Sequence, residues 1–267
     1  MPAEIHPTAI IASGAEIGDN VSIGPYCCIG DNVRIGNDTV LHQSVIIDGY
    51  TDIGEGNEIF PHAVLGKAPQ HTRYKGEAST LTIGHNNLIR EHVTMHPGTE
   101  VGGMVTRIGS NGMFMAGSHI AHDCVVEDHV IFSNYVQVGG HVHIGKHCYL
   151  GALVGVHPFV RIGRNTIIGG LAKVESDIIP FSRADGNACY VDGINIIGLE
   201  RNGFSKASIK TLRRAYKDLF KAEGSFEQRL TRAQATYAGD EDVKVILDFI
   251  TSNEKRAIMQ ANRNGKS

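Results

Sequence analysis

Several features that this sequence lacks narrow the class of protein to which it can belong. Tryptophan is absent from its 267 residues, and aromatic residues make up only 6%. So little aromatic mass argues against one large core of packed rings. The 25 lysines and arginines are balanced by 28 acidic residues, for a formal charge of −3. A protein whose main partner is nucleic acid would need a strong basic excess, so this class is excluded.

Paired cysteines and long apolar runs are also missing. The five cysteines form no CxxC pair, which is typical of reduced core thiols in a cytosolic protein; they are Cys27, Cys28, Cys124, Cys148 and Cys189. The first ten residues are too polar for a secretion signal. No apolar run approaches the ~18 residues of a membrane span. We therefore expect a cytoplasmic protein without stable membrane insertion.

Glycine, by contrast, is abundant at 32 residues, and it belongs to a repeat. From Ile5 to Leu65 every sixth residue is isoleucine or leucine, often followed by glycine. The repeat is interrupted near 67–82, resumes in phase, and is interrupted again near 97–107. It then continues, shifted by one residue, as far as Val174. Internal repeats of this regularity indicate a solenoid.

A period of six fits neither an α-helix nor a simple alternating strand. It fits a short strand plus a corner, with one aliphatic side chain pointing inward on each side. Three sides make a triangular coil of about 18 residues, and parallel strands of successive coils stack about 4.8 Å apart. Glycine, asparagine and aspartate would supply the positive φ angles at the corners. The predicted fold class is mainly β, a parallel β-helix over residues 1–180.

The repeat ends near residue 180, and a different pattern follows. Residues 181–203 are predicted to be a connecting segment, and residues 204–267 an α-helical C-terminal domain. Apolar residues at helical spacing and helix-start signals predict three helices, beginning at Ser205, at Ser225 with its capping partner Gln228, and near Asp240. The basic tail, residues 256–266, is predicted to be solvated.

Fourteen histidines are many for this length. His122, His141 and His157 are spaced by 19 and 16 residues, so they should nearly stack along one edge of the solenoid, with His119 close by. Imidazole is the side chain best suited to proton transfer near neutral pH. The alternative is a ladder of half-exposed polar residues, but convergence beside two interrupting loops favours a site.

The sequence around these histidines resembles a known family. The segment Ser118–Cys124 (SHIAHDC) is followed by Gly139-Gly140-His141 and Gly155-Val156-His157. Upstream stand residues 89–96 (IREHVTMH) and 70–77 (QHTRYKGE), and downstream stand GIN at 193–195 and GLERNGF at 198–204. In this order the segments resemble the UDP-N-acetylglucosamine acyltransferases that start lipid A biosynthesis, within the hexapeptide-repeat superfamily. The resemblance spans essentially the whole chain.

The resemblance implies a fold, a reaction and a set of site residues. The β-helix should be left-handed, although the general rule for β-crossovers favours the right-handed sense. A 3-hydroxyacyl chain would pass from acyl carrier protein to the sugar 3-position, in a homotrimer without a metal or other cofactor. His122 would be the general base, with Asp123 orienting it and the Gly140 N–H as oxyanion donor. The implied substrate-binding residues are Gln70, His71, Arg73, His119, His141, His157, Asn195 and Arg201. Gly170 and Ala188 would set acyl length.

Some positions depart from the family pattern. His71 stands where an aspartate is common and Arg73 where a lysine is common. Because both positions belong to the sugar end, a 3-amino analogue of the sugar nucleotide is an alternative acceptor. Ile197 and Asn202 replace a glutamate and an arginine near the nucleotide. A glycine at 170 would leave room for a long acyl chain, of order fourteen carbons by analogy.

Three other classes of protein share parts of this pattern. A gamma-type zinc carbonic anhydrase shares the fold, but it needs three imidazoles within about 2.1 Å of one ion. The N-acyltransferase that acts later in the same pathway would carry an extra uridine-binding domain before the repeats, whereas here the repeats begin at Ile5. A purely structural solenoid would leave the histidines and both interruptions unexplained.

Overall fold

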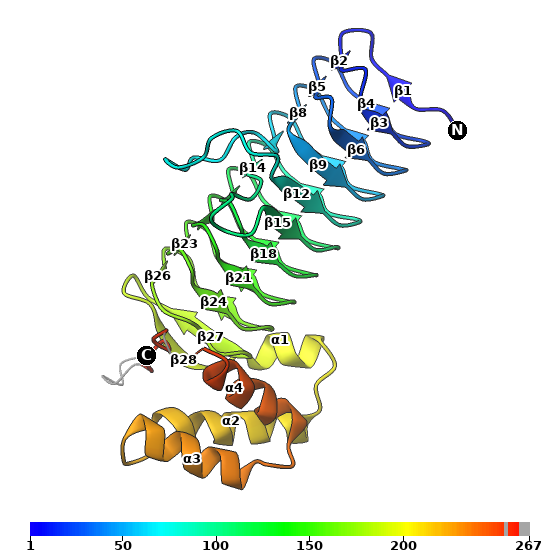
Figure 1. Cartoon of the computed structure of the whole chain (residues 1–267). Helices are drawn as coiled ribbons and strands as arrows, with labels where there is room; N and C mark the ends of the chain where they lie inside the picture. Colours follow the sequence, from blue (N-terminus) through cyan, green and yellow to red (C-terminus); the bar gives the residue numbers. More distant parts are fainter. Residues whose placement is uncertain (254–255, 262–267) are drawn as a thin grey trace.

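The computed structural model describes residues 1–253 and 256–261. The chain winds as a triangular solenoid, and four helices pack at its C-terminal end (Figure 1). Each coil contributes one short strand to each of three sheets, and strands of successive coils pair in parallel. The predicted fold class is confirmed: the chain is a left-handed parallel β-helix followed by a small helical region.

The three sheets contain 11, 9 and 8 strands. Sheet A consists of β1 (Glu4–Ile5), β4 (Ser22–Ile23), β7 (Val40–Leu41), β10 (Glu58–Ile59), β13 (Leu88–Ile89), β16 (Met113–Phe114), β19 (Ile131–Phe132), β22 (Tyr149–Leu150), β25 (Ile167–Ile168), β27 (Ser182–Asp185) and β28 (Tyr190–Ile194). Sheet B consists of β2 (Ile10–Ile11), β5 (Cys28–Ile29), β8 (Ile46–Ile47), β11 (Val64–Leu65), β14 (Thr94–Met95), β17 (His119–Ile120), β20 (Gln137–Val138), β23 (Gly155–Val156) and β26 (Lys173–Val174). Sheet C consists of β3 (Glu16–Ile17), β6 (Val33–Ile35), β9 (Tyr50–Ile53), β12 (Thr80–Ile83), β15 (Val105–Ile108), β18 (Val125–Val126), β21 (His143–Ile144) and β24 (Arg161–Ile162).

The aliphatic residue of each hexad points into the solenoid. Ile5 pairs with Ile23, and Ile23 with Leu41, so the side chains form one continuous column. Ile23 and Leu41 are buried, whereas Ile5 is 43% exposed because no coil lies above it. Burial of this column contributes about 25 cal/mol per Å² of apolar surface. The period of six is therefore the period of the core.

The small residue two places before the aliphatic fills the inside of a corner. Cys27, Cys124 and Cys148 each donate their S–H to a backbone carbonyl 15 residues later, over 2.9 to 3.1 Å. Burial raises the pKa of Cys124 and Cys148 to about 12, so both remain thiols. The five cysteines are free, as expected, and these three act as hydrogen-bonding core residues.

The outer corner positions adopt positive φ, but glycine, asparagine and aspartate do not fill them all. Tyr135, Leu153 and Phe159 have φ of 58°, 62° and 67°. Such residues rarely adopt this conformation. Side chains at this position can pack on the same position of the next coil, as the ring of His129 stacks on that of His147 with centroids 4.7 Å apart. The expectation from turn chemistry alone was therefore too narrow, because contacts between coils offset the local strain.

Residues 181–203, which were predicted to connect the two domains, contain regular elements of their own. β27 continues sheet A in parallel and then pairs antiparallel with β28, and α1 (Ile196–Arg201) follows at once. Phe181, Ala184 and Val191 are fully buried. This hairpin covers the open end of the apolar column, which would otherwise face water.

The helical region contains α2 (Lys206–Phe220), α3 (Phe226–Thr236) and α4 (Glu241–Thr251). Ser205 and Asp240 cap α2 and α4, and the predicted capping box of Ser225 and Gln228 is present. The predicted region extends to residue 267, of which 254–255 and 262–267 lie outside the described residues. The first half of the predicted basic tail, residues 256–261, is described and is not solvated as predicted, because Arg256 pairs with Asp177 and Ile258 and Met259 are buried. None of the helices in the described part has the length and apolar character needed to span a membrane.

A buried ion pair joins this region to the solenoid. The Asp177 carboxylate is fully buried and accepts from the Nε atoms of Arg161 and Arg256, over 2.6 and 2.9 Å. Arg161 also donates to Ser252 Oγ and to the Phe249 carbonyl at the end of α4. Asp177 thus anchors both α4 and the segment after it.

Candidate active site

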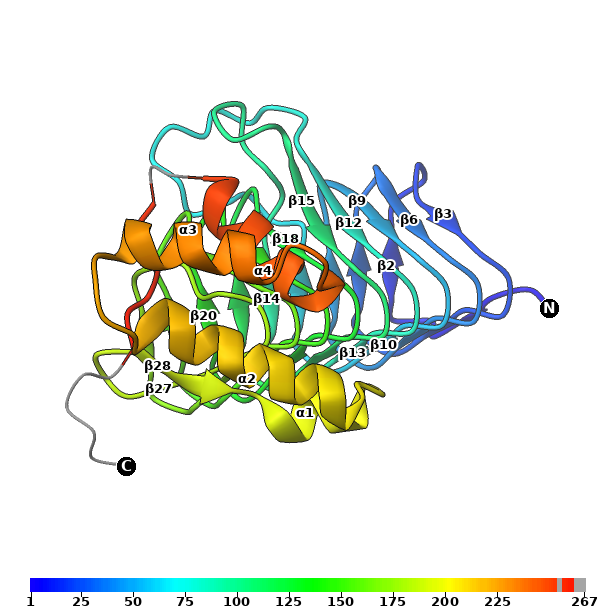
Figure 2. The same cartoon turned by 90° about the horizontal axis from the view of Figure 1, so that it is seen from below.

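Both interrupting loops leave the solenoid at the same corner, between sheets B and C. Residues 66–79 connect β11 to β12, and residues 96–104 connect β14 to β15. The next three coils place Ala121–Asp123, Gly139–His141 and His157–Phe159 at this corner. We call it the loop corner. The two loops project from one side of the solenoid in both views (Figures 1 and 2).

His122, His141 and His157 share this corner but do not stack in register. His122 aligns with Gly140 and Pro158, whereas Asp123 aligns with His141 and Phe159. The spacings of 19 and 16 residues each differ from the 18-residue coil, so every histidine occupies a different corner position. His157 is exposed, and its Nδ1 lies 3.1 Å from the Pro158 carbonyl oxygen. The three histidines therefore do not form the expected stack, because each is offset from the corner position of the others.

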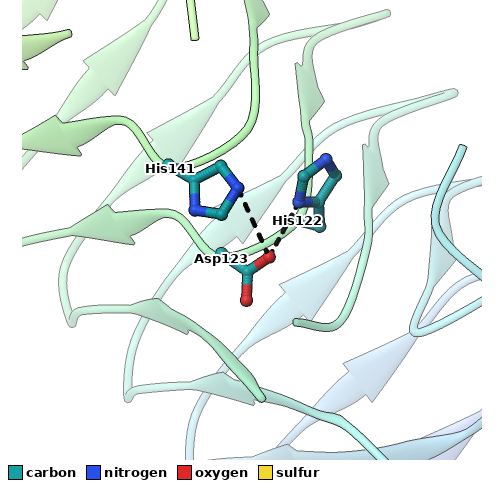
Figure 3. A group of neighbouring side chains, drawn as sticks. All are labelled: His122, Asp123 and His141. Carbon is teal, nitrogen blue, oxygen red and sulfur yellow. Dashed lines mark hydrogen bonds and ion pairs between the residues drawn. The ribbon is translucent and has the colours of Figure 1, made fainter. Parts of the chain in front are cut away.

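The offset brings His122 and Asp123 together. His122 Nδ1 lies 2.8 Å from Asp123 Oδ2 (Figure 3). Asp123 can bend back to its neighbour because it occupies the corner, with φ of 59°. An ionised carboxylate only accepts hydrogen bonds, so Nδ1 carries the hydrogen and Nε2 keeps its lone pair. The His122 side chain is 11% exposed and that of Asp123 is fully buried.

Two threonines hold Asp123, and the sequence analysis did not single out either. The Thr99 N–H and hydroxyl donate to Oδ1 and Oδ2, over 2.9 and 2.6 Å. The Asp123 N–H donates to the Thr106 hydroxyl oxygen over 2.8 Å. Both threonines are buried. Thr99 lies in the 96–104 loop, outside the hexad count, so no periodic signal pointed to it.

Gly140 packs against the flat side of the base. A Cβ atom at this position would lie 2.5 Å from His122 Cε1 and 2.7 Å from Nε2. Any side chain would therefore displace the imidazole. The Gly140 N–H makes no hydrogen bond within the described chain, so it is free to meet a ligand oxygen beside Nε2.

Two further imidazoles flank His122. The ring of His141 lies 5.1 Å from that of His122 and stacks on Phe159 at 4.3 Å. Burial lowers the pKa of His141, although Asp123 opposes this effect. The ring of His71, from the 66–79 loop, lies 4.6 Å from His122 on its other side. The base thus lies between two further imidazole rings.

His119 lies on the face of sheet B beside the loop corner. Its Nδ1 is 2.7 Å from the Thr94 hydroxyl, and its ring contacts that of His96 at 5.1 Å. Burial, with the positive charges that His96 and His122 can carry, lowers the pKa of His119 to about 4. His119 is therefore a neutral hydrogen-bonding group at physiological pH.

A shallow apolar groove runs along sheet B from this histidine. It has a volume of about 360 Å³. Outward positions of successive strands line it: His119 pairs with Gln137, Gln137 with Gly155, and Gly155 with Lys173. In the described part of the chain, no heavy atom apart from those of Gly155 and its two chain neighbours lies within 4 Å of the place where a Gly155 Cβ would stand. The missing side chain leaves the groove open in the middle.

The two residues implied in acyl length lie in and after the coil that contains Lys173, the last residue of the groove. Ala188 bridges to Lys173 and so extends the same outward column. Gly170 lies in the exposed turn just before β26, where a Cβ would stand 3.1 Å from the Ala152 carbonyl oxygen. Both are thus placed on the C-terminal side of the histidines.

Other implied residues are not brought to the base within this chain. Gln70 and Arg73 are exposed on the 66–79 loop, and Arg201 is exposed at the end of α1. Asn195 caps α1, accepting from the Gly198 N–H and donating to the Asn165 carbonyl. Both views place α1 on the side of the solenoid opposite the two loops (Figures 1 and 2).

His122, Asp123 and His141 offer possible metal ligands within 4.8 Å of one another. A metal would have to replace the hydrogen on His122 Nδ1 and compete with Thr99 for Asp123 Oδ2. The hydrogen-bonded arrangement therefore fits a proton-transfer pair better than a metal centre. His157 does not belong to the group, so the three-histidine zinc site of the carbonic anhydrase alternative is not formed within the described chain.

Comparison with known proteins gives consistent matches. Residues 177–259 match the model of domain 2 of UDP-N-acetylglucosamine O-acyltransferase, and residues 141–176 match the bacterial transferase hexapeptide model. The acyl-[acyl-carrier-protein]–UDP-N-acetylglucosamine O-acyltransferase of Rhizobium johnstonii is 43% identical, over 99% of this chain and 97% of that protein.

Solved structures also match nearly the whole chain. The UDP-N-acetylglucosamine O-acyltransferase of Moraxella catarrhalis is 39% identical with a TM-score of 0.92, covering 96% of this chain and 99% of that one. The UDP-N-acetylglucosamine acyltransferase of Francisella novicida is 35% identical with a TM-score of 0.94, covering 97% and 95%.

Proposed function

The chain belongs to the family of acyl-[acyl-carrier-protein]–UDP-N-acetylglucosamine O-acyltransferases, and from this premise we propose which of its residues carry out the transfer. It is an acyltransferase that moves the acyl group of an acyl carrier protein to UDP-N-acetylglucosamine. In the proposed mechanism, His122 Nε2 takes the proton of the sugar 3-hydroxyl as that oxygen attacks the thioester carbonyl. The new C–O bond forms, the C–S bond breaks, and the proton passes to the leaving thiolate.

The observation that carries this assignment is the 2.8 Å contact between His122 Nδ1 and the buried Asp123 carboxylate. It fixes the tautomer in which Nε2 is the acceptor. It also stabilises the imidazolium that forms when Nε2 takes the proton. Because the Gly140 N–H lies beside the same ring, it is the proposed donor to the oxyanion of the tetrahedral intermediate.

We assign the groove on sheet B to the 3-hydroxyacyl chain. Its apolar lining begins at His119, near the base, and ends at Lys173, which bridges to Ala188 and follows Gly170 by three residues. Each CH₂ buried there would contribute about 0.8 kcal/mol. The absence of side chains at Gly155 and Gly170 favours a long chain.

Gly170→Met is expected to shorten the preferred acyl chain. The new side chain would enter the end of the groove, and steric exclusion of long chains would outweigh the small gain per contact. The preference is measured as kcat/KM across acyl carrier proteins loaded with 3-hydroxyacyl chains of increasing length. An unchanged preference would place the length limit elsewhere, with Ala188 as the next position to test.

We propose that the enzyme works as a homotrimer with sites between subunits. Asn195 and Arg201 stand at the two ends of α1, which lies on the side of the solenoid opposite the two loops, so they would reach a sugar nucleotide held at the loop corner from another copy. Gln70, His71, Arg73, His119, His141 and His157 would bind it from the first subunit. The Arg201 guanidinium suits the diphosphate, because it can make two parallel hydrogen bonds to phosphate oxygens.

Light scattering at micromolar concentration is expected to give three times the mass of the 28.8 kDa chain. Mixing two inactive variants provides the control. His122→Ala and Arg201→Ala subunits, unfolded and reassembled together, should regain activity, because some sites then combine an intact His122 with an intact Arg201. A fully active monomer would contradict the shared site.

The outer face of α2 is suited to an acidic partner such as acyl carrier protein. Its exposed cations are Lys206, Lys210, Arg213, Arg214 and Lys217. The opposite face, which includes Ile209 and Leu212, is buried against the rest of the chain. We propose that acyl carrier protein docks on this basic face, in a cytoplasmic reaction that is the first step of lipid A biosynthesis and uses no metal or other cofactor.

The deciding assay offers the pure enzyme several 3-hydroxyacyl carriers with UDP-N-acetylglucosamine or its 3-amino analogue. Transfer to the 3-hydroxyl is the expected result. Transfer only to the 3-amino sugar would support the alternative acceptor, for which the ring of His71 beside the base is the structural reason. No transfer to either sugar would refute the proposed function.

A further inference from the structure

The 96–104 loop places Thr99 in the interior of the loop corner. Thr99 is 1% exposed. Its hydroxyl lies 2.6 Å from Asp123 Oδ2 and its N–H 2.9 Å from Oδ1. Since a carboxylate only accepts, both groups donate. Asp123 Oδ2 thus receives hydrogen bonds from Thr99 and from His122 Nδ1 at the same time.

The loop holds Thr99 rigidly in this position. The Thr99 carbonyl accepts from the N–H groups of Gly102 and Met104, both over 3.0 Å. The Gly98 N–H is tied to the Thr80 carbonyl on β12. A Cβ at Gly102 would stand 2.1 Å from an Asp123 carboxylate oxygen, so the loop backbone closes directly over the carboxylate.

The two hydrogen bonds to Asp123 Oδ2 share the negative charge of one carboxylate oxygen. Each hydrogen bond to the ionised form lowers its affinity for a proton. The hydrogen bond from Thr99 therefore weakens the attraction between Asp123 and the His122 imidazolium. The imidazolium then gives up its proton more easily. The other titratable groups facing this pair are His141, with Nε2 3.9 Å from Oδ2, His71, and the electrostatically interacting His96 and His119.

We propose that Thr99 is a positioning residue of this enzyme: it fixes the Asp123 carboxylate and limits how strongly Asp123 retains the proton of His122. This inference rests on the proposed role of His122. It assigns a chemical purpose to the second interruption of the repeat, which delivers a donor to a carboxylate that the solenoid alone leaves uncovered.

Thr99→Val removes the hydroxyl and keeps both the shape and the backbone N–H. We expect kcat/KM to fall by roughly 10- to 100-fold, the range typical when a side chain loses the hydrogen-bond partner that orients it. The acid limb of the pH profile of kcat/KM should also move to higher pH, because Asp123 would hold the imidazolium more tightly. Thr99→Ser restores the donor and should restore the wild-type limb.

Thr166→Val is the matched control. Thr166 is also fully buried, and its hydroxyl donates to the Gly163 carbonyl over 2.7 Å at a different corner. It should leave the acid limb in place, whatever it does to stability. In an Asp123→Asn background, Thr99→Val should lower kcat/KM by less than about twofold, because Thr99 acts through the carboxylate that this background removes.

Three outcomes would overturn the proposal. They are an unmoved acid limb in Thr99→Val, an acid limb that also moves in Thr166→Val, and a roughly 10- to 100-fold loss of kcat/KM when Thr99→Val is added to Asp123→Asn. If Thr99→Val fails to fold, Thr99→Ala takes its place, since it also removes the hydroxyl; the same shift of the acid limb is expected, and an unmoved limb in Thr99→Ala would overturn the proposal. A wild-type enzyme with no acid limb would refute the role of His122 itself, so the two failures are distinguishable.

Discussion

His122→Ala is expected to abolish turnover while leaving the fold and the oligomer intact. General base catalysis typically contributes about 10²–10⁴ in rate, so the loss in kcat/KM should fall in or above that range. The fold should survive because the His122 side chain projects at a corner, outside the aliphatic column that stabilises the solenoid. Steady-state kinetics with UDP-N-acetylglucosamine and an acyl carrier protein measure the loss, and circular dichroism checks the fold.

His141→Ala and His157→Ala are the comparison variants. Both residues share the loop corner, but neither makes a hydrogen bond to Asp123, so they should act mainly through KM for the sugar nucleotide. A general loss of stability would weaken all three variants alike. The rate of the wild type should also fall toward acid pH as Nε2 takes up a proton. If His122→Ala keeps more than about a tenth of the wild-type kcat/KM, the assignment of the base is wrong.

Asp177→Asn is expected to have the largest effect on stability. Removing this buried charge leaves Arg161 and Arg256 facing a neutral group in a largely enclosed site. Breaking a buried ion pair in this way typically costs about 3–5 kcal/mol. Chemical denaturation should show the loss, and hydrogen exchange should show that α4 and residues 256–261 open first, because Asp177 anchors both.

Glu175→Gln provides a control only two residues away. Glu175 pairs with Lys173 on the exposed surface. Exposed pairs contribute little because water screens them, so this variant should unfold like the wild type. If Asp177→Asn also unfolds like the wild type, the ion pair does not secure the junction between the solenoid and the helices.

The sequence by itself determined the solenoid and its helical end. Which residues point inward depends only on the local geometry of a strand and a corner, and that geometry repeats. The count from Ile5 therefore predicted the buried column, as the burial of Ile23 and Leu41 shows. Helix starts are equally local, because a cap such as Ser225 with Gln228 lies within one turn of its own helix. His122 and Asp123 are neighbours in the chain, so their place at a corner could also be expected.

Only the tertiary structure decided what surrounds that pair. One-residue offsets from the 18-residue coil placed His141 beside Asp123 and turned His157 outward. Thr99 reaches Asp123 across 24 residues through a loop that follows no period. The hairpin of residues 182–194 exists because the apolar column needs a cover. These contacts depend on how distant segments pack in space, and a repeat in the sequence describes only what each coil does locally.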